Sequence, residues 1–259
     1  MMNGLFNRVI PCLLLQDGGL VKTQQFKKPK YVGDPINAVR IFNDKYVDEL
    51  IFLDIRASRL NQEPDYDLVE RIAGECFMPL CYGGGVKTLE QAKRLVSLGV
   101  EKIAVNSACI YHTDLVKELV AELGSQSVVG AIDVKRNFWG DERVYDASQS
   151  KLTSLDPFEH AQGMVAAGVG EILVNDVDRD GMFSGYNLEL IAKLSHKTGV
   201  PLIICGGANN LDDMRQAFSS GASAAAAGSM FVFYGPHRAV LITYPEYAQV
   251  KALFVGKPS

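Results

Sequence analysis

Two stretches of the sequence combine glycines and small polar residues in a way that suits the binding of an anion. Glycine lets backbone N–H groups approach a phosphate closely, and the start of a following helix adds a favourable dipole. Each stretch has a glycine pair at the end of one apolar run and a polar pair at the end of the next. The residues are Gly84, Gly85, Asn106 and Ser107 in the first stretch and Gly206, Gly207, Gly228 and Ser229 in the second. We therefore predict two phosphate sites.

These stretches belong to a long internal repeat. Residues 84–107 match residues 206–229 without a gap, at an offset of 206 − 84 = 122. The same offset places Glu49 on Glu171. Residues 8–14 match residues 127–133 at an offset of 133 − 14 = 119. A repeat of this length predicts a duplicated unit, with half-barrels over about 1–124 and 125–259.

The elements that must position these residues alternate along the chain. Amphipathic stretches separate short apolar runs, a pattern typical of parallel strands covered by helices. Helices are expected to start at Asp34, Thr88 and Asp156 and to end near Gly99, Gly168 and Gly221. The runs are 8–14, 50–54, 79–84, 102–106, 127–133, 171–176, 201–207 and 223–229. An open doubly wound sheet gives the same alternation, but the duplication favours closure. We predict an α/β fold, a single (βα)8 TIM barrel over residues 1–259, with the chemistry at the carboxyl ends of its strands.

The composition of the chain argues against some classes of function. The chain has 259 residues, 47% of them hydrophobic, and a net charge of −4. Neither a nucleic-acid partner nor a membrane partner is expected. Cys12, Cys81 and Cys205 lie inside apolar runs, which favours a reduced, cytoplasmic chain over a disulfide framework or a metal site. We expect no metal and no cofactor.

Several charged residues stand at the predicted strand ends. Asp133 closes the fifth run and is a candidate general acid or base, unless Lys135 or an amide merely fixes it. The turn at Asp180 and Gly181 is a candidate for closing over a substrate. Lys22 lies in a long basic loop after the first run, which is a candidate lid that grips an anion.

The opposite ends of the strands are charged as well. Arg8, Glu49, Lys102 and Glu171 fall at the starts of the first, second, fourth and sixth runs. Charges at the closed bottom of a barrel are costly unless they are paired or used. Two interpretations fit this pattern: a structural plug of ion pairs, and a gate that admits a small molecule from a partner.

Taken together, these segments resemble the HisF family, the cyclase subunits of imidazole glycerol phosphate synthase. The resemblance extends to about residue 233. It is carried by DELIFLDIRAS (48–58), CYGGGVKTLEQA (81–92), EKIAVNSA (101–108), VVGAIDVKR (128–136), GEILVNDVDRDGMFSGY (170–186) and ICGGANN (204–210).

The resemblance implies a function for each group of residues. Such proteins receive ammonia from a glutaminase partner, HisH, docked at the barrel bottom, through a gate that matches Arg8, Glu49, Lys102 and Glu171. They use the ammonia to split and cyclise a nucleotide with two phosphates, PRFAR, into imidazole glycerol phosphate and AICAR. The phosphate residues match Gly85, Asn106 and Ser107 on one side and Asp180, Gly181, Gly207 and Ser229 on the other. The lid lysine matches Lys22, and one of two catalytic aspartates matches Asp133.

One departure changes the expected activity. Similar proteins read CLDVKDG on the first strand, and this chain reads CLLLQDG (12–18), so Leu14 stands where the other catalytic aspartate is expected. A leucine cannot transfer a proton. Three interpretations remain: a working cyclase of histidine biosynthesis, a paralogue that serves a different amidation, and a non-catalytic ammonia conduit or scaffold. We favour the second. Paralogues of this kind accompany N-acetyl sugar amidotransferases of lipopolysaccharide pathways, where an acetamido group becomes acetamidino.

Overall fold

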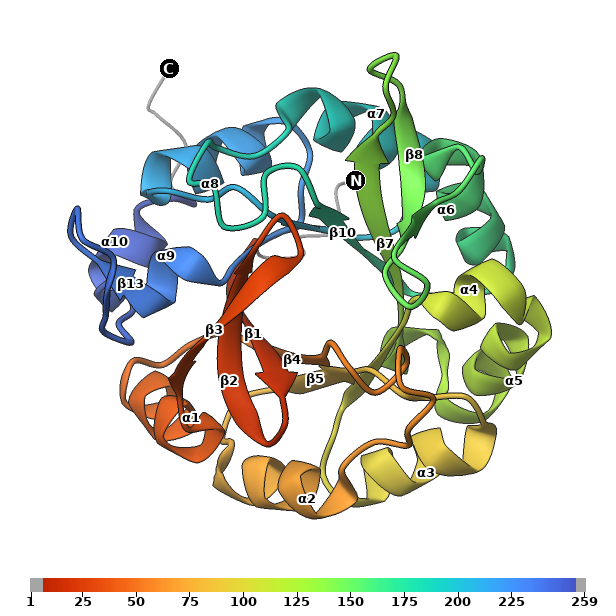
Figure 1. Ribbon diagram of the computed structural model, residues 1–259, viewed down its shortest axis with the longest axis horizontal. Helices are drawn as coiled ribbons and strands as arrows, with labels where there is room; N and C mark the ends of the chain where they lie inside the picture. The colour runs from red at the N-terminus through yellow and green to blue at the C-terminus, as the bar shows by residue number, and fades with distance from the viewer. Residues whose placement is uncertain (1–6, 255–259) are drawn as a thin grey trace.

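Eight parallel strands close into a barrel in the computed structural model, which describes residues 7–254. In chain order the barrel strands are β1 (Arg8–Gln16), β4 (Leu50–Asp54), β5 (Leu80–Gly83), β6 (Lys102–Val105), β7 (Val128–Arg136), β10 (Glu171–Asp176), β11 (Leu202–Cys205) and β12 (Ala224–Ala227). Strand β1 pairs with β12 and β4, and β10 pairs with β7 and β11. Figure 1 shows the helices as a ring outside these strands. The predicted (βα)8 barrel is confirmed, whereas the assignment of residues 1–259 to one domain stays a prediction.

The helices begin and end at the residues that the sequence marks. Asp34 and Asp156 cap α1 and α6 with their side chains, and Thr88 and Gln91 form a capping box at α3. Gly99, Gly168 and Gly221 have positive φ angles just after helices. The helices are α1 (Pro35–Asp44), α2 (Tyr66–Glu75), α3 (Leu89–Ser97), α4 (Ser107–Tyr111), α5 (Thr113–Leu123), α6 (Pro157–Ala166), α7 (Leu188–Thr198), α8 (Leu211–Ser219), α9 (Ser229–Val232) and α10 (Tyr247–Lys251), with a 3-10 turn η1 (Ser125–Ser127).

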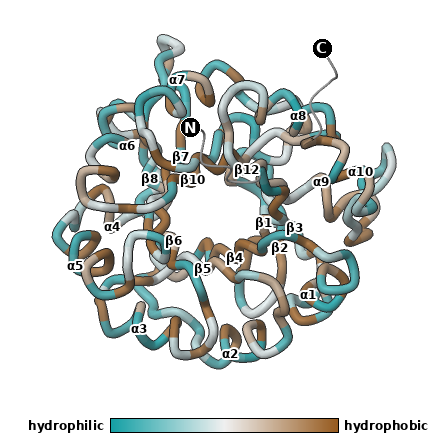
Figure 2. The backbone as a smooth tube through the Cα atoms, turned by 180° about the vertical axis from the view of Figure 1, so that it is seen from behind, coloured by the Kyte–Doolittle hydropathy of each residue, from teal (hydrophilic) through white to brown (hydrophobic). Residues whose placement is uncertain are grey.

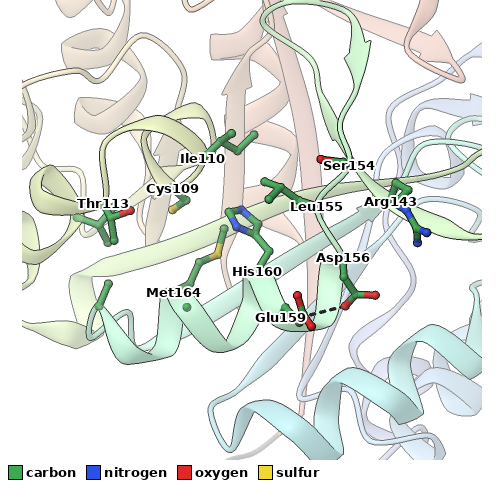
Figure 3. Close-up of a pocket in the computed structure, with 13 residues that line it drawn as sticks. Cys109, Ile110, Thr113, Arg143, Ser154, Leu155, Asp156, Glu159, His160 and Met164 are labelled. Atoms are coloured by element: carbon green, nitrogen blue, oxygen red, sulfur yellow. Dashed lines mark hydrogen bonds between the residues drawn. The ribbon is translucent and has the colours of Figure 1, made fainter.

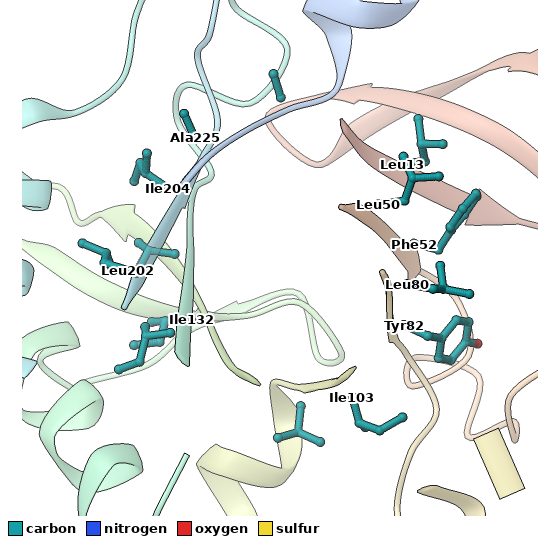
Figure 4. Close-up of a cluster of buried hydrophobic side chains, with 14 of the residues drawn as sticks. Leu13, Leu50, Phe52, Leu80, Tyr82, Ile103, Ile132, Leu202, Ile204 and Ala225 are labelled. Atoms are coloured by element: carbon teal, nitrogen blue, oxygen red, sulfur yellow. The ribbon is translucent and has the colours of Figure 1, made fainter. Parts of the chain in front are cut away.

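Buried apolar side chains form two clusters because successive strand residues point to opposite faces. The outer cluster lies between the strands and the helices. Figure 4 shows some of its members: Leu50 and Phe52 of β4 lie beside Leu80 and Tyr82 of β5, their register partners. The inner cluster fills the barrel itself. In Figure 2 the strands appear as apolar segments around the centre, while the helices alternate apolar and polar residues.

A hairpin follows the first barrel strand of each half. Strands β2 (Gly19–Gln24) and β3 (Lys27–Gly33) follow β1, and β8 (Glu142–Asp146) and β9 (Lys151–Leu152) follow β7. The basic segment around Lys22 is therefore not the open loop that the sequence predicts. It pairs with the extended end of β1, where Leu14 faces Val21 and Gln16 faces Gly19.

The segment after α9 departs from the repeat. It forms a small hairpin of β13 (Phe233–Tyr234) and β14 (Ala239–Val240), and then α10. Tyr244 between them is buried and donates a hydrogen bond to the carbonyl oxygen of Val9 at 3.0 Å. This segment thereby closes the barrel wall between the last and the first strand. Over residues 7–254 we find no helix that is both long enough and apolar enough to span a membrane.

Candidate functional site

The carboxyl ends of the barrel strands surround a cavity of about 560 Å³, which we call the mouth cavity. The predicted residues of the first half line it: Gly84, Gly85, Asn106 and Ser107. Gly84 has a φ of +118°, and a Cβ there would lie 2.4 Å from the Asp54 carbonyl oxygen, so only glycine fits. The Gly85 N–H donates to Ser58 Oγ at 3.1 Å. The first predicted phosphate site therefore opens onto the mouth.

The corresponding glycines of the second half have the same backbone form but different surroundings. Gly206 and Gly207 have φ angles of +93° and +108°, and a Cβ on Gly207 would lie 2.2 Å from the Gly185 carbonyl oxygen. None of the second-half residues predicted for phosphate binding lines the mouth cavity. At Gly228 the Lys22 side chain fills the space, because its Nζ lies 2.0 Å from where a Cβ would stand. The sequence predicts two equivalent sites, and the structure brings only the first to the cavity.

The hairpin β2–β3 packs against part of the second site, at Asp180, Gly181 and Gly228. Thr23 Oγ1 donates to Asp180 Oδ2 at 2.6 Å, and the Gln25 N–H donates to the Asp180 carbonyl oxygen at 2.9 Å. A Cβ on Gly181 would meet the Thr23 carbonyl oxygen at 2.2 Å, so this glycine permits the contact. Burial raises the pKa of Asp180, although the hydrogen bond from Thr23 opposes the shift. Asp180 and Gly181 thus hold the hairpin down.

Lys22 is buried beneath this hairpin and does not reach the mouth cavity. Its Nζ donates to the Cys12 carbonyl oxygen at 2.6 Å. Burial lowers the pKa of Lys22, while the charge of Asp180 acts in the opposite direction. In this position Lys22 Nζ binds a backbone oxygen, and its role in gripping an anion stays a prediction.

Asp133 lies at the end of β7, inside the mouth cavity, and is 9% exposed. Its Oδ2 accepts a hydrogen bond from Asn106 Nδ2 at 2.9 Å. Burial raises the pKa of Asp133 to about 7; the Asn106 hydrogen bond opposes this, and the charges of Asp180 and Asp146 reinforce it. A carboxyl with such a pKa can both give and take a proton near neutral pH, as a general acid or base must.

Leu14 lines the same cavity from β1, at the position that the repeat aligns with Asp133. It is 7% exposed, and its register partners are Leu53 of β4 and Val21 of β2. The mouth therefore carries one titratable side chain and one hydrocarbon at its two pseudo-equivalent positions.

Sequence reasoning missed Asn175 at the end of β10. Asn175 lines the mouth cavity, is 8% exposed, and is the register partner of Asp133. Its Oδ1 is buried and accepts no hydrogen bond from any described residue. The alternation Glu171, Leu173, Asn175 along one strand face is the signal that could have found it, because residues two apart point to the same side.

The cysteines give no metal site. Among residues 7–254 no group of three or more histidine, cysteine, aspartate or glutamate side chains could hold a metal ion. Cys12, Cys81 and Cys205 are buried free thiols, and Cys12 and Cys205 line the floor of the mouth cavity.

At the other end of the barrel, four charged side chains form a closed ring of ion pairs, which we call the bottom ring. Its members are Arg8, Glu49, Lys102 and Glu171. Lys102 Nζ lies 2.9 Å from a carboxylate oxygen of each glutamate, and Arg8 donates to both. The glutamates are 2% and 6% exposed. Burial lowers the pKa of Lys102, but the charges of Glu171 and Glu49 more than offset this and raise it. Each charge in the ring has two opposite neighbours.

A layer of buried apolar side chains separates the bottom ring from the mouth cavity. On β1, Ile10 lies between Arg8 of the ring and Cys12 of the cavity floor, and on β4 Ile51 lies between Glu49 and Leu53. These residues belong to a fully buried set that does not line the cavity: Ile10, Ile51, Cys81, Val129, Ile203, Ala224 and Ala226. Anything that passes from the ring to the mouth must cross this apolar layer.

The fold and the two ends of its axis define the class: a (βα)8 barrel with a charged ring at the bottom and a carboxyl-bearing cavity at the mouth. The model of the family described as "Histidine biosynthesis protein" matches residues 8–237, and the chain belongs to this family.

Three relatives place the chain with HisF proteins. It is 55% identical over 250 residues to the "Putative imidazole glycerol phosphate synthase subunit hisF2" of Pseudomonas aeruginosa, covering 96% of this chain and 98% of the relative. It is 47% identical to the similarly named subunit hisF3 of Vibrio vulnificus, covering 95% and 96%. It is 38% identical to the "Imidazole glycerol phosphate synthase subunit HisF" of Exiguobacterium sibiricum, covering 88% and 91%. The resemblance seen in the sequence is thus confirmed.

Proposed function

We propose that this HisF-type chain receives ammonia from a HisH-type glutaminase and supports the amidation of an N-acetylated sugar nucleotide, not the histidine cyclase reaction. The observation that carries this proposal is the contrast between the two ends of the barrel. The bottom ring is complete, while Leu14 occupies the mouth position at which the resemblance predicts a catalytic aspartate.

The bottom end supports passage of ammonia. Neutral ammonia is small and can cross an apolar layer such as that around Ile10 and Ile51, whereas a bare ammonium ion pays a large desolvation penalty there. The bottom ring closes the entrance with ion pairs that a docked glutaminase would have to rearrange. Four buried or half-buried charges at this end are well explained if they are used as a gate.

The side chain at position 14 in the mouth argues against the ordinary cyclase reaction. A positioned general acid or base typically contributes about 10²–10⁴-fold in rate, and Leu14 contributes none. The proposed acceptor is therefore handled with a third protein, an N-acetyl sugar amidotransferase, and this chain supplies ammonia and a phosphate grip at Gly85, Asn106 and Ser107.

Asp133 favours a second candidate function. With its pKa near 7 and Asn106 held against it, Asp133 is prepared for proton transfer, as a working cyclase would require. In that case PRFAR and ammonia are converted to imidazole glycerol phosphate and AICAR. A non-catalytic conduit is the limiting case of the favoured proposal.

The first experiment separates these functions. PRFAR and an ammonium salt are added to the purified chain, and substrate loss is followed against an ordinary HisF. We expect turnover reduced at least about 10²-fold. Turnover within a fewfold of ordinary HisF would show that the chain is a working cyclase.

The second experiment tests the glutaminase partner. The chain is mixed with the HisH-type glutaminase from the same genome, and complex formation is measured by size-exclusion chromatography together with glutamine hydrolysis. We expect a heterodimer that Glu49→Ala weakens, because that change opens the bottom ring. If no complex forms, the ammonia-receiving role is wrong.

A further inference from the structure

A second cavity lies in the barrel wall, away from both ends of the barrel axis. Its volume is about 490 Å³, and it shares no lining residue with the mouth cavity. We call it the side cavity. It lies between α4 and α5 on one side and α6 on the other. Its apolar walls include Cys109, Ile110, Val116, Leu155 and Met164. Its polar lining residues are Thr113, Arg143, Ser154, Asp156, Glu159 and His160. This size and mixture are typical of small-molecule sites.

Gly163 keeps part of the side cavity open. It lies inside α6, where glycine costs roughly 1 kcal/mol of helix stability relative to alanine. A Cβ on Gly163 would meet no atom within 4 Å, so no neighbour requires a glycine at this position. Its φ is not in the left-handed region either. A ligand that comes close to the helix backbone would explain why a glycine stands here.

The internal repeat shows what fills the corresponding place in the other half. At the offset of 122, Met164 corresponds to Phe42 and Cys109 to Phe231, since 164 − 42 = 122 and 231 − 109 = 122. The ring of Tyr244 packs against both phenylalanines, with centroids 6.3 Å from Phe42 and 5.0 Å from Phe231. On the side-cavity face, a thioether and a thiol take the place of the two rings.

His160 gives the side cavity one polar group without a partner. Its repeat counterpart is Ala38, since 160 − 38 = 122. Figure 3 shows the His160 side chain among Cys109, Leu155 and Met164. Its Nε2 is buried and makes no hydrogen bond to any described residue. Burial lowers the pKa of His160, which favours a neutral imidazole. A neutral imidazole can exchange one hydrogen bond with a neutral hydroxyl group.

We propose that the side cavity binds a small neutral aromatic molecule with one hydroxyl group, a phenol, with its ring against Met164 and its hydroxyl on His160. The ring takes the place that Tyr244 occupies in the other half, and methionine sulfur suits a ring face or edge. The hydroxyl satisfies His160 Nε2 once rotation of the imidazole turns this buried atom toward the cavity, since a buried nitrogen is costly to leave unpaired. This site is independent of the proposed amidation role, since it involves neither the mouth cavity nor the bottom ring.

The first test measures the binding of p-cresol to the full chain by calorimetric titration. We expect a Kd of about 1 mM or below, in line with the affinity that so few atoms can give. Gly163→Leu places a side chain in the open space and should weaken binding at least about 10-fold. Gly74→Leu is the matched control, because Gly74 is also an exposed helical glycine, in α2, with no atom within 4 Å of a Cβ. Absence of binding at 10 mM (about tenfold the expected Kd), or equal weakening by both changes, would overturn the proposal.

The second test isolates the hydrogen bond by comparing p-cresol with toluene. In the native chain p-cresol should bind about 10-fold more tightly, which corresponds to one hydrogen bond of ordinary strength. In His160→Leu this ratio should fall to about 1 while toluene still binds. A ratio that His160→Leu leaves unchanged would show that the hydroxyl binds elsewhere and would contradict the assignment.

Discussion

The two ends of this barrel differ in how far they keep its internal twofold symmetry. At the bottom the symmetry is kept: Glu49 and Glu171, one from each half, each bind both Arg8 and Lys102. At the mouth it is lost. The first half opens onto the mouth cavity at Gly85 and Ser107, while the corresponding Gly207 and Ser229 of the second half do not line it. Asp133 faces the cavity from one half and Leu14 from the other.

The difference shows that a duplicated backbone does not fix duplicated chemistry. The glycine turns persist in both halves because their φ angles and close contacts exclude other residues. The residues around those turns are free to change, and a single leucine or one docked hairpin makes the mouth one-sided. Four changes test this contrast, from the largest expected effect to the smallest.

The bottom ring should respond equally to loss of either glutamate. Glu49→Gln and Glu171→Gln each leave buried positive charge poorly compensated, and each should lower the free energy of unfolding by about 3–5 kcal/mol. Urea unfolding measures this. Arg40→Ala, which breaks an exposed ion pair with Glu75, is the control and should lower stability far less, because water and salt screen an exposed pair. Unequal losses at Glu49 and Glu171 would show that the bottom is as asymmetric as the mouth.

Restoring the missing acid should make the mouth more symmetric in function. Leu14→Asp should raise PRFAR turnover with ammonium at least about 10²-fold, since it supplies a second proton-transfer group opposite Asp133. The rate is followed by substrate loss. Leu14→Asn has a similar shape without the titratable proton and serves as the control. If Leu14→Asp brings no gain, other mouth residues have diverged as well.

The buried Asp133 at the mouth should make stability depend on pH. Asp133 has a folded-state pKa of about 7, above its unfolded value, so its favourable contribution is complete only at acid pH and is lost as pH rises through 7. Between pH 5 and pH 8 the native chain should lose roughly 2–3 kcal/mol relative to Asp133→Asn. Urea unfolding at the two pH values gives the difference. A constant difference would mean that Asp133 is already ionised at pH 5.

The two phosphate turns should differ in binding while the hairpin stays docked. Ser107→Ala should weaken binding of inorganic phosphate about 10-fold, because it removes a hydrogen bond to a charged ligand. Ser229→Ala, at the covered turn, should change it less than about twofold. Calorimetric titration of both variants tests this. Similar losses in both would mean that the hairpin opens readily and that both sites bind.

Much of this arrangement could be predicted from particular residues of the sequence. Asp34, Thr88 and Asp156 marked helix starts because their side chains satisfy free N–H groups, and these are local effects. The gapless repeat at 122 residues indicated closure of the barrel. The four members of the bottom ring were found because each begins a barrel strand or directly precedes one, and such starts meet at one end of a barrel.

Other features could not be read in this way. The sequence predicts a loop around Lys22 and gives no sign of the hairpin β2–β3, or of the bond from Lys22 Nζ to the Cys12 carbonyl oxygen. Asn175 was missed, although it lies beside Asp133 in the sheet register. The side cavity exists because no aromatic ring packs beside Met164 and Cys109. A missing side chain leaves no local sequence pattern from which it could be predicted. Each of these depends on which distant segments come together.

The sequence by itself determined the eight barrel strands, several helix ends, the glycine turns and the charges at the bottom of the barrel. These depend on local backbone preferences and on a repeat that needs no coordinates. Only the tertiary structure decided which of the two equivalent glycine turns faces the mouth cavity. That outcome depends on contacts between segments that are distant in the chain. Thr23 and Asp180, which form a hydrogen bond, are 157 residues apart, and Gly185 packs against Gly207. Such long-range contacts are set by packing and burial, which no short stretch of sequence specifies.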